Sequence, residues 1–278
     1  MSNLLVVDMG NQRLKWAILS VVPGLSVDKI FSEIEKRNGA LSIVEPGALK
    51  QGARPADQLV ESVGVPERIV FSCVSARQAG EAFVTLSRES WGIEPQKILA
   101  EDSRYGLENQ YDLPQQLGAD RWLAALAAYH MMQGSDRGDH AIIVIDAGTA
   151  VTVDLVVDNQ FRGGSILPGV AMLVRALGIS TGEIRIDIES LTKRSNNLGE
   201  LDVVATNSDA AVWAGSLASV TGGIERCLDM MQRTSESPIK VLVTGGDADL
   251  VASMISYRCE VIPNLVLAGL ALTASESM

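Results

Sequence analysis

The sequence predicts an α/β protein with two similar halves, and three observations support this fold class. Apolar, strand-like segments alternate with segments whose apolar residues recur at helical spacing. A strand, an Asp-x-Gly turn and a returning strand occur twice, in LLVVDMGNQRLKWAIL at 4–19 and AIIVIDAGTAVTVDLV at 141–156. The chain has 278 residues, 47% of them hydrophobic, which is enough to fill a core in each half.

The first half begins with two predicted strands, at about 3–8 and 13–20, on either side of the first turn. Residues 21–56 contain Pro-Gly and Asn-Gly pairs that mark turns between short segments. One of these pairs, Asn38-Gly39, lies between IFSEIEKR and ALSIVE. Because Asn-Gly is the favoured dipeptide of tight hairpin turns, this stretch predicts a β-hairpin.

Helices and strands alternate in the rest of the first half. ADQLVESVG and QAGEAFVTLSRESWG have apolar residues at helical spacing, and the second segment ends at Gly92. Between them, ERIVFSCVS is typical of a strand. Residues 103–118 are polar and rich in turn residues, so we expect an ordered but irregular crossing between the halves.

The second half opens with ADRWLAALAAYHMMQ, whose small and apolar residues predict a helix buried on most sides. The same periodicities predict the elements that follow. In order, they are strands at about 141–146, 151–157 and 161–166, a helix after Pro168, a polar segment near 180–200, a long helix at about 206–232, a strand and a helix in KVLVTGGDADLVASMI, and a closing helix in NLVLAGLALTAS.

Composition excludes several classes of function. The net charge of -11, without a basic stripe, argues against a nucleic-acid partner. No apolar run approaches the ~20 residues that span a bilayer, and no basic region precedes the first strand, so we expect a cytoplasmic protein without a membrane partner. The three cysteines lack metal-like spacing, which favours free buried thiols. They are Cys73, Cys227 and Cys259.

Each Asp-x-Gly turn joins a carboxylate at the end of a buried strand to a glycine that lets backbone N–H groups approach a ligand. Asp8 and Asp146 could each hold a metal ion beside a bound anion. If the halves face one another, the two turns hold one polyphosphate from opposite sides, which suits phosphoryl transfer. The alternative for a single Asp-x-Gly is an ordinary hairpin turn, and its recurrence in matching contexts favours the ligand role.

A third glycine-rich turn, Thr244-Gly245-Gly246-Asp247, follows a predicted strand and precedes a helix. It would suit a nucleotide base or ribose, and equally a pair of glycines required by packing. None of the three turns matches the phosphate-binding P-loop or a dinucleotide fingerprint. A nucleotide would therefore be held by a different device.

The chain resembles the type III pantothenate kinases, of the acetate kinase, sugar kinase, Hsp70 and actin superfamily. The resemblance covers nearly the whole chain and depends mainly on four motifs: DMGNQRLKWA at 8–17, LGADRWLAALAA at 117–128, IDAGTAVTVDLV at 145–156 and FRGGSILPG at 161–169. It implies two ribonuclease-H-like halves, at 1–117 and 118–278, with a central cleft. It also implies a homodimer that phosphorylates pantothenate with ATP, Mg²⁺ and a monovalent cation, K⁺ or NH4⁺.

The resemblance also implies site residues. Asp120 matches the general base, Asp8 lies near Mg²⁺, and Asp146 matches the monovalent-cation site. Positions that match ATP contacts are Asp8, Met9, Gly10, Asn11, Gln12, Arg13, Leu14, Lys15 and Thr149. Positions that match pantothenate contacts are Tyr111, Gly118, Ala119, Asp120, Arg121 and Thr206.

The residues themselves point the same way, with alternatives. Asp120 falls in the first turn of its predicted helix, where the dipole stabilises an anion that can accept a proton, but aspartate is also a common helix-start residue. Arg121 could hold a substrate or pair with a nearby carboxylate. Lys15 could lie on an exposed strand face, and Tyr111 could anchor a loop. Thr149 could be a turn residue and Thr206 a helix N-cap.

The chain departs from the family pattern at Gln12, where a Thr or Ser usually follows the Gly-Asn of the first turn. The longer amide donates from another position, so ATP affinity or the phosphate pose could differ. Two other functions compete with the kinase. One is a regulatory or binding protein on the same scaffold, which is disfavoured by the retention of Asp8, Asp120, Arg121, Asp146 and Thr149. The other is a kinase with a different acceptor, such as a sugar or a carboxylate.

Overall fold

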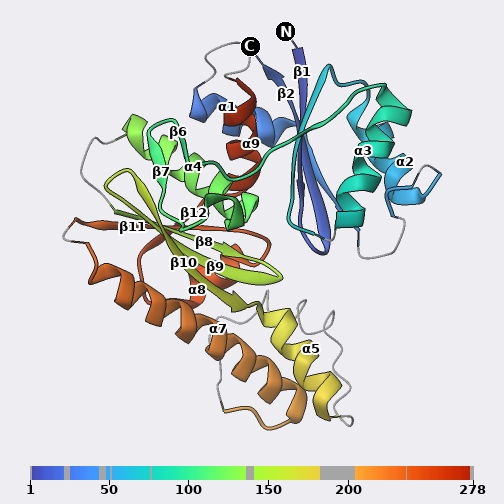
Figure 1. Cartoon of the computed structure of the whole chain (residues 1–278). Helices are drawn as coiled ribbons and strands as arrows, with labels where there is room; N and C mark the ends of the chain where they lie inside the picture. Colours follow the sequence, from blue (N-terminus) through green and yellow to red (C-terminus); the bar gives the residue numbers. More distant parts are fainter. Residues whose placement is uncertain are drawn as a thin grey trace. The chain divides into compact units, whose positions relative to one another are not determined.

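The computed structural model describes residues 2–21, 26–43, 48–50, 52–75, 77–135, 141–181, 204–235 and 237–275 (Figure 1). The chain forms two compact units, and neither is continuous in sequence. The first unit comprises Met1–Gly138, Asp158–Arg162 and Asn264–Met278. The second comprises Asp139–Val157 and Gly163–Pro263. The first unit thus includes the helix that the sequence placed in the second half, and the division at residue 117 stays a prediction.

The first unit is built on a five-stranded sheet in the order β3-β2-β1-β4-β5. Its strands are β1 (Ser2–Met9), β2 (Arg13–Val21), β3 (Asn38–Ser42), β4 (Arg68–Cys73) and β5 (Gln96–Lys97). Pairing is antiparallel between β1, β2 and β3, and parallel between β1, β4 and β5. The strands predicted on either side of the first turn, and in ERIVFSCVS, are confirmed.

Helices cover both faces of this sheet, as Figure 1 shows: α2 and α3 lie on one side, α1 and α9 on the other. Their bounds are α1 (Val27–Lys36), α2 (Arg54–Val63), α3 (Arg77–Trp91), α4 (Ala119–Ser135) and α9 (Leu265–Ser275). Leu5, Val7 and Met9 of β1 belong to the core cluster that includes residues of α2 and α3. Since side chains alternate along a strand, Asp8 points to the face covered by α1, α4 and α9.

The predicted hairpin at Asn38-Gly39 is wrong, because the segment before it forms α1. Ile30 and Ile34 recur at a spacing of four and are both buried, which is a helical pattern. Asn38 begins β3, and its Nδ2 donates to the carbonyl oxygen of Ile34 at 2.7 Å. A Cβ on Gly39 would lie 2.7 Å from the Trp16 ring, so this glycine makes room for an indole on β2.

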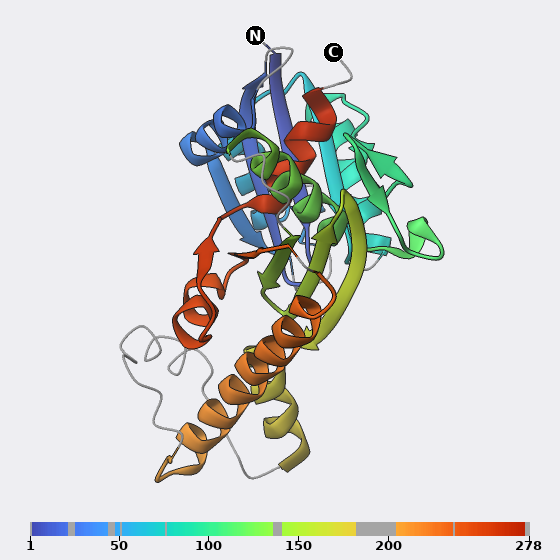
Figure 2. The same ribbon diagram turned by 90° about the vertical axis from the view of Figure 1, so that its left-hand side faces the viewer.

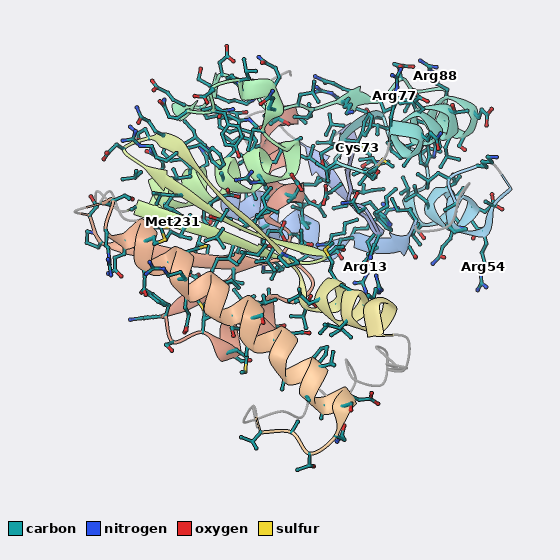
Figure 3. All side chains as sticks on the ribbon, turned by 60° about the horizontal axis from the view of Figure 1, so that its bottom comes forward. Arg13, Arg54, Cys73, Arg77, Arg88 and Met231 are labelled. Atoms are coloured by element: carbon teal, nitrogen blue, oxygen red, sulfur yellow. The ribbon has the colours of Figure 1, made fainter. Side chains whose placement is uncertain are left out.

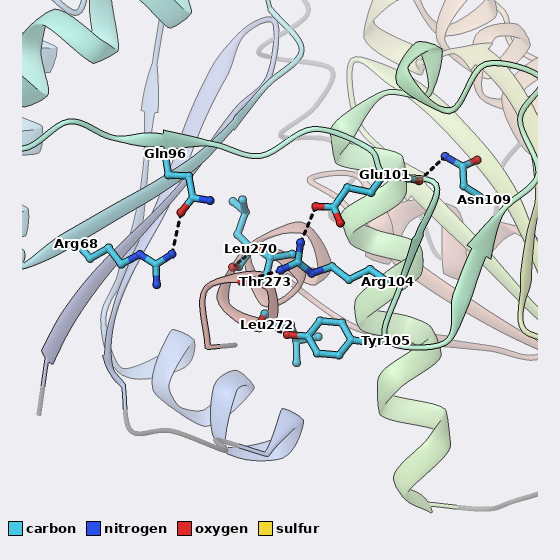
Figure 4. Close-up of polar contacts among 9 residues, drawn as sticks. All are labelled: Arg68, Gln96, Glu101, Arg104, Tyr105, Asn109, Leu270, Leu272 and Thr273. Atoms are coloured by element: carbon cyan, nitrogen blue, oxygen red, sulfur yellow. Dashed lines mark hydrogen bonds and ion pairs between the residues drawn. The ribbon is translucent and has the colours of Figure 1, made fainter. Parts of the chain in front are cut away.

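The segment predicted to be irregular, 103–118, contains short regular elements: β6 (Ser103–Arg104), β7 (Leu107–Asn109) and the 3₁₀ helix η1 (Pro114–Gln116). It is tied to α9 by polar contacts (Figure 4). Arg104 donates to the carbonyl oxygen of Thr273 at 3.1 Å, and the Tyr105 hydroxyl donates to that of Leu272 at 2.6 Å. A Cβ on Gly269 would lie 2.2 Å from the Leu123 carbonyl oxygen, so α4 and α9 also pack closely.

The second sheet has seven strands in the order β12-β11-β8-β9-β10-β7-β6, and the second unit contains β8, β9, β11, β12 and most of β10. These five strands are β8 (Ala141–Ala147), β9 (Ala150–Val157), β10 (Gln160–Pro168), β11 (Ile239–Thr244) and β12 (Cys259–Val261). The helices are α5 (Val170–Thr181), α7 (Ser208–Gln232) and α8 (Ala248–Met254), with the long α7 plain in Figure 2. The strands and helices predicted here are confirmed, while most of the polar segment near 180–200 lies outside the described residues.

Strands β8 to β12 of the seven-stranded sheet repeat the order of the five-stranded sheet. In each unit the first strand is central, the second and third follow on one side, and the fourth and fifth follow on the other. The first and second strands pair antiparallel, and the first, fourth and fifth pair parallel. The turn that occurs twice in the sequence therefore joins the first two strands of each unit. Across the described part of the chain, no helix is long and apolar enough to cross a membrane.

Candidate active site

The first Asp-x-Gly turn joins β1 to β2 and is closed by a backbone hydrogen bond from Gly10 N to Arg13 O at 3.0 Å. Asp8 is half-buried at the end of the central strand. Its register partners are Lys15 on β2 and Ser72 on β4, so these three side chains share one face of the sheet. The Ser72 hydroxyl donates to Asp8 Oδ1 at 2.8 Å.

The predicted ATP contacts around this turn differ in exposure. Met9 and Leu14 are fully buried in the core, so their side chains do not reach a ligand there. Asn11 and Arg13 are exposed, while Gln12 and Lys15 are half-buried. Because the N–H of Gly10 is used within the turn, a phosphate would be met by other amides of the turn and by polar side chains.

The second Asp-x-Gly turn joins β8 to β9 and is one residue shorter than the first. Gly148 N donates to Ala150 O at 3.0 Å, and Asp146 and Thr149 are half-buried. Asp146 is in register with Thr152 on β9 and with Thr244 on β11. As in the first turn, the glycine N–H closes the hairpin. That the two turns hold one polyphosphate stays a prediction.

The third glycine-rich turn packs against the second. Asp247 N donates to Ala147 O at 2.9 Å. Gly245 has φ of +103°, and a Cβ there would lie 2.2 Å from Ala147 O and 2.6 Å from Asp146 Oδ1. Of the two roles left open by the sequence, the packing role accounts for Gly245. Because Gly245 has no side chain, the end of β11 can lie close to the Asp146 carboxylate.

Asp120 lies half-buried in the first turn of α4, where the sequence placed it. Its Oδ1 accepts a hydrogen bond from Arg121 N at 2.8 Å. Burial raises the pKa of the Asp120 carboxyl above its usual 3.8, and the N–H and charge of Arg121 oppose this rise. A Cβ on Gly118 would lie 2.6 Å from Asp120 Oδ1, so the glycine leaves the space that this carboxylate occupies.

Arg121, Tyr111 and Phe161 form a compact cluster next to Asp120. The Arg121 side chain is 7% exposed, and its Nη1 donates to the Tyr111 hydroxyl at 2.7 Å. The guanidinium carbon lies 5.7 Å from the Tyr111 ring centroid and 5.9 Å from that of Phe161. The two rings are 6.0 Å apart. A buried guanidinium between two aromatic faces has a fixed orientation, as a group that binds a substrate requires.

The remaining predicted contact, Thr206, is exposed just before α7. Asn207 is the N-cap of that helix, because its Oδ1 accepts from Ala210 N at 2.9 Å. Capping therefore does not account for Thr206. Ala119 is buried in the first turn of α4, beside the other LGADRW residues.

Sequence reasoning missed three residues that support this site. Ser72 lies in a strand that otherwise reads as apolar, and Phe161 begins a quoted motif without having been assigned a role. Asn109 is 8% exposed, and its Oδ1 accepts from Tyr111 N at 3.1 Å. A buried polar residue two positions before a predicted contact is the signal that could have found Asn109.

The side chains available as ligands indicate which metal ion this site could bind. Across the residues described, no three His, Cys, Asp or Glu side chains gather as a metal cluster. Mg²⁺ bound with a nucleotide keeps water and phosphate ligands and needs only one or two carboxylates. The half-buried Asp8, with the Ser72 hydroxyl on one of its oxygens, therefore fits an ion of this kind.

A surface groove of about 630 Å³ lies apart from these residues, along α3 and the ends of β4 and β5. Arg77 and Arg88 line it together with Cys73 (Figure 3). Both arginines are ion-paired, to Glu81 and Glu94 respectively. None of the predicted site residues lines this groove.

Comparison with known proteins places these features in a family. The family model described as type III pantothenate kinase matches residues 4–230. A type III pantothenate kinase from Nitrosococcus oceani is 31% identical over 275 residues, covering 99% of this chain and 94% of that protein. One from Methylibium petroleiphilum is 32% identical over 282 residues, covering 98% of each.

A solved structure supports the fold. The putative 2-dehydro-3-deoxygalactonokinase from Sinorhizobium meliloti has a TM-score of 0.52 and 14% identity, covering 98% of this chain and 96% of that one. At this identity the likeness concerns the fold alone. The predicted fold class of two ribonuclease-H-like halves is confirmed.

Proposed function

The chain belongs to the type III pantothenate kinase family, and from this premise we propose how its residues transfer a phosphoryl group from ATP to the primary hydroxyl of pantothenate, the first step of coenzyme A biosynthesis. One observation carries the proposal. Asp8 points to the face of the first sheet that α4 helps to cover, and the first turn of α4 carries the half-buried Asp120. Asp8, which could bind a metal ion, and Asp120, which could accept a proton, thus belong to the same unit.

Asp120 is the general base in this proposal. Its raised pKa makes the ionised carboxylate a better proton acceptor than an exposed aspartate. Arg121 and Tyr111 orient pantothenate as a hydrogen-bonded pair, held by the aromatic cluster. Gly118 and Ala119 shape the same end of α4, and Thr206 is assigned to pantothenate from the family pattern.

The turn from Asp8 to Lys15 binds the ATP phosphates, with Asp8 next to Mg²⁺. Asp8 would hold this ion, which would offset the negative charge of the phosphates. Lys15 is the register partner of Asp8, so an ammonium group and a carboxylate lie side by side near the ends of β1 and β2. Thr149 supplies a further phosphate contact. Asp146 holds the monovalent cation, K⁺ or NH4⁺. We further propose a cytoplasmic homodimer, as in the family.

The assay that tests this function supplies ATP, Mg²⁺, K⁺ and pantothenate and measures 4'-phosphopantothenate. We expect product formation, and a rate roughly tenfold or more lower when K⁺ is replaced by a bulky organic cation, because a bound cation contributes a large local charge at the phosphates. Indifference to monovalent cations would remove the assignment of Asp146. Without product under any cation, the regulatory function becomes the better explanation. Product from a sugar or a carboxylate instead would identify a different acceptor.

Gly118→Ala should lower kcat roughly 100-fold with little change in stability. The new Cβ would lie 2.6 Å from Asp120 Oδ1, so the carboxylate must rotate, and a displacement of about 1 Å at a reacting group has a cost of this order. Steady-state rates and the urea midpoint of unfolding measure the two effects. Gln116→Ala, an exposed substitution in the preceding η1, is the control. A Gly118→Ala enzyme with full kcat would show that the carboxylate position is unimportant.

A further inference from the structure

We propose that Ser72 is a positioning residue of the phosphate site: its buried hydroxyl holds the Asp8 carboxylate in the orientation that binds Mg²⁺·ATP. This inference rests on the proposed function, in which Asp8 lies next to Mg²⁺. It adds to the site a residue from β4, 64 positions away from Asp8 in the chain.

The hydrogen bond from Ser72 Oγ to Asp8 Oδ1 is 2.8 Å long, and Ser72 is 0% exposed. The bond runs between neighbouring parallel strands at the last register pair but one, Asp8 with Ser72. Hydrogen bonds to a charged acceptor are stronger than neutral ones and fix the plane of a carboxylate. With Oδ1 engaged in this way, the carboxylate has a defined orientation on the end of its strand.

The second unit shows the same arrangement at the equivalent place. Thr244 on β11, the fourth strand of that unit, is the register partner of Asp146 and is 3% exposed. In both units a buried hydroxyl residue on the fourth strand thus stands beside the aspartate on the first. Apolar residues usually fill buried strand positions, so a hydroxyl residue at both points to a shared purpose.

If Ser72 had only a structural role, loss of its hydroxyl would have the same effect as loss of another buried hydroxyl in the first unit. Ser87 on α3 is also 0% exposed, and its hydroxyl donates only to the carbonyl oxygen of Phe83, one turn earlier in the same helix, at 2.9 Å. Loss of either hydroxyl removes one buried hydrogen bond from the first unit. Only loss of the Ser72 hydroxyl removes a hydrogen bond from the Asp8 carboxylate. The pair Ser72→Ala and Ser87→Ala therefore separates positioning from stability.

The experiment compares wild type with Ser72→Ala, Ser87→Ala and Asp8→Asn. Calorimetric titration with ATP, in Mg²⁺ and in EDTA, gives a readout independent of turnover. For Ser72→Ala we expect the Mg²⁺-dependent part of ATP affinity to fall roughly 10- to 100-fold, the usual effect of losing a residue that orients a metal ligand. The Mg²⁺ concentration for half-maximal rate should rise by a similar factor. Ser87→Ala should retain both values.

Ser72→Cys retains a weak donor of similar size and should recover part of the Mg²⁺ dependence. Ser72→Ala with wild-type Mg²⁺·ATP affinity would overturn the positioning role, as would equal losses in Ser72→Ala and Ser87→Ala. Asp8→Asn separates the two levels of the argument. If its Mg²⁺ dependence is also unchanged, the assignment of Asp8 fails, and with it the proposed phosphate site. If Asp8→Asn loses Mg²⁺ dependence while Ser72→Ala does not, only this inference fails.

Discussion

Asp120→Asn should lower kcat roughly 10²- to 10⁴-fold, the range that a positioned general base contributes, while the protein still binds ATP. Asparagine keeps an oxygen for the N–H of Arg121 but does not accept the proton of an alcohol. Rates of 4'-phosphopantothenate formation measure the loss. Asp112→Asn, at an exposed position seven residues before α4, is the matched control and should retain full activity. Full activity of Asp120→Asn would remove this residue as the base.

The raised pKa of Asp120 gives this prediction a pH dependence. The base is active when ionised, so kcat/KM for pantothenate should fall as pH decreases through a value above the usual 3.8. The ionised carboxylate is the active form of the base, but its burial lowers the stability of the folded protein. Because the folded state disfavours the ionised carboxylate, Asp120→Asn should be at least as stable as wild type at pH 7, and this difference should shrink as pH falls toward 3.8. Thermal unfolding at several pH values measures it.

Gly245→Ala should lower the free energy of unfolding by about 2–5 kcal/mol, from left-handed backbone strain together with overpacking. A methyl group there would lie 2.2 Å from the Ala147 carbonyl oxygen and 2.6 Å from Asp146 Oδ1. The backbone of the second turn must therefore move, so K⁺ activation should weaken as well. Urea unfolding, followed by the rate with and without K⁺, measures both effects.

Gly222→Ala is the matched control for that substitution. Gly222 lies on α7 in the same unit, and a Cβ there meets nothing within 4 Å. Alanine in an exposed helical position should stabilise by roughly 0.5–1 kcal/mol. If Gly245→Ala is as stable as Gly222→Ala and keeps its response to K⁺, then β11 does not pack against the Asp146 turn as described.

Most of the fold could be predicted because its elements have clear periodicities. The helix of ADRWLAALAAYHMMQ forms α4 because almost every position is small or apolar. The hairpin prediction fails at Asn38-Gly39 because burial of Ile30 and Ile34 on one helix face outweighs the turn preference of the dipeptide. The glycine there serves Trp16, a contact between strands that local sequence does not reveal.

Some residues of the candidate site could be predicted from the sequence, and others could not. Gly118, Asp120 and Arg121 are neighbours in sequence, so one motif indicates them all. Ser72 could not be predicted, because its role depends on β4 lying next to β1 in a particular register. Phe161 likewise reaches Arg121 only through the pairing of β10 with β7. Side chains that act across strands become visible only when the sheet order is known.

The position of α9 has a consequence for biosynthesis on the ribosome. This helix is buried along nearly its whole length and packs on α4, yet it is translated after every other helix and strand that the structure describes. The strands of the first unit are therefore translated long before the helix that completes their hydrophobic core emerges. The second unit, whose residues end at Pro263, has all of its parts earlier. Nascent chains thus expose an incomplete N-terminal core during synthesis, the situation in which chaperones engage.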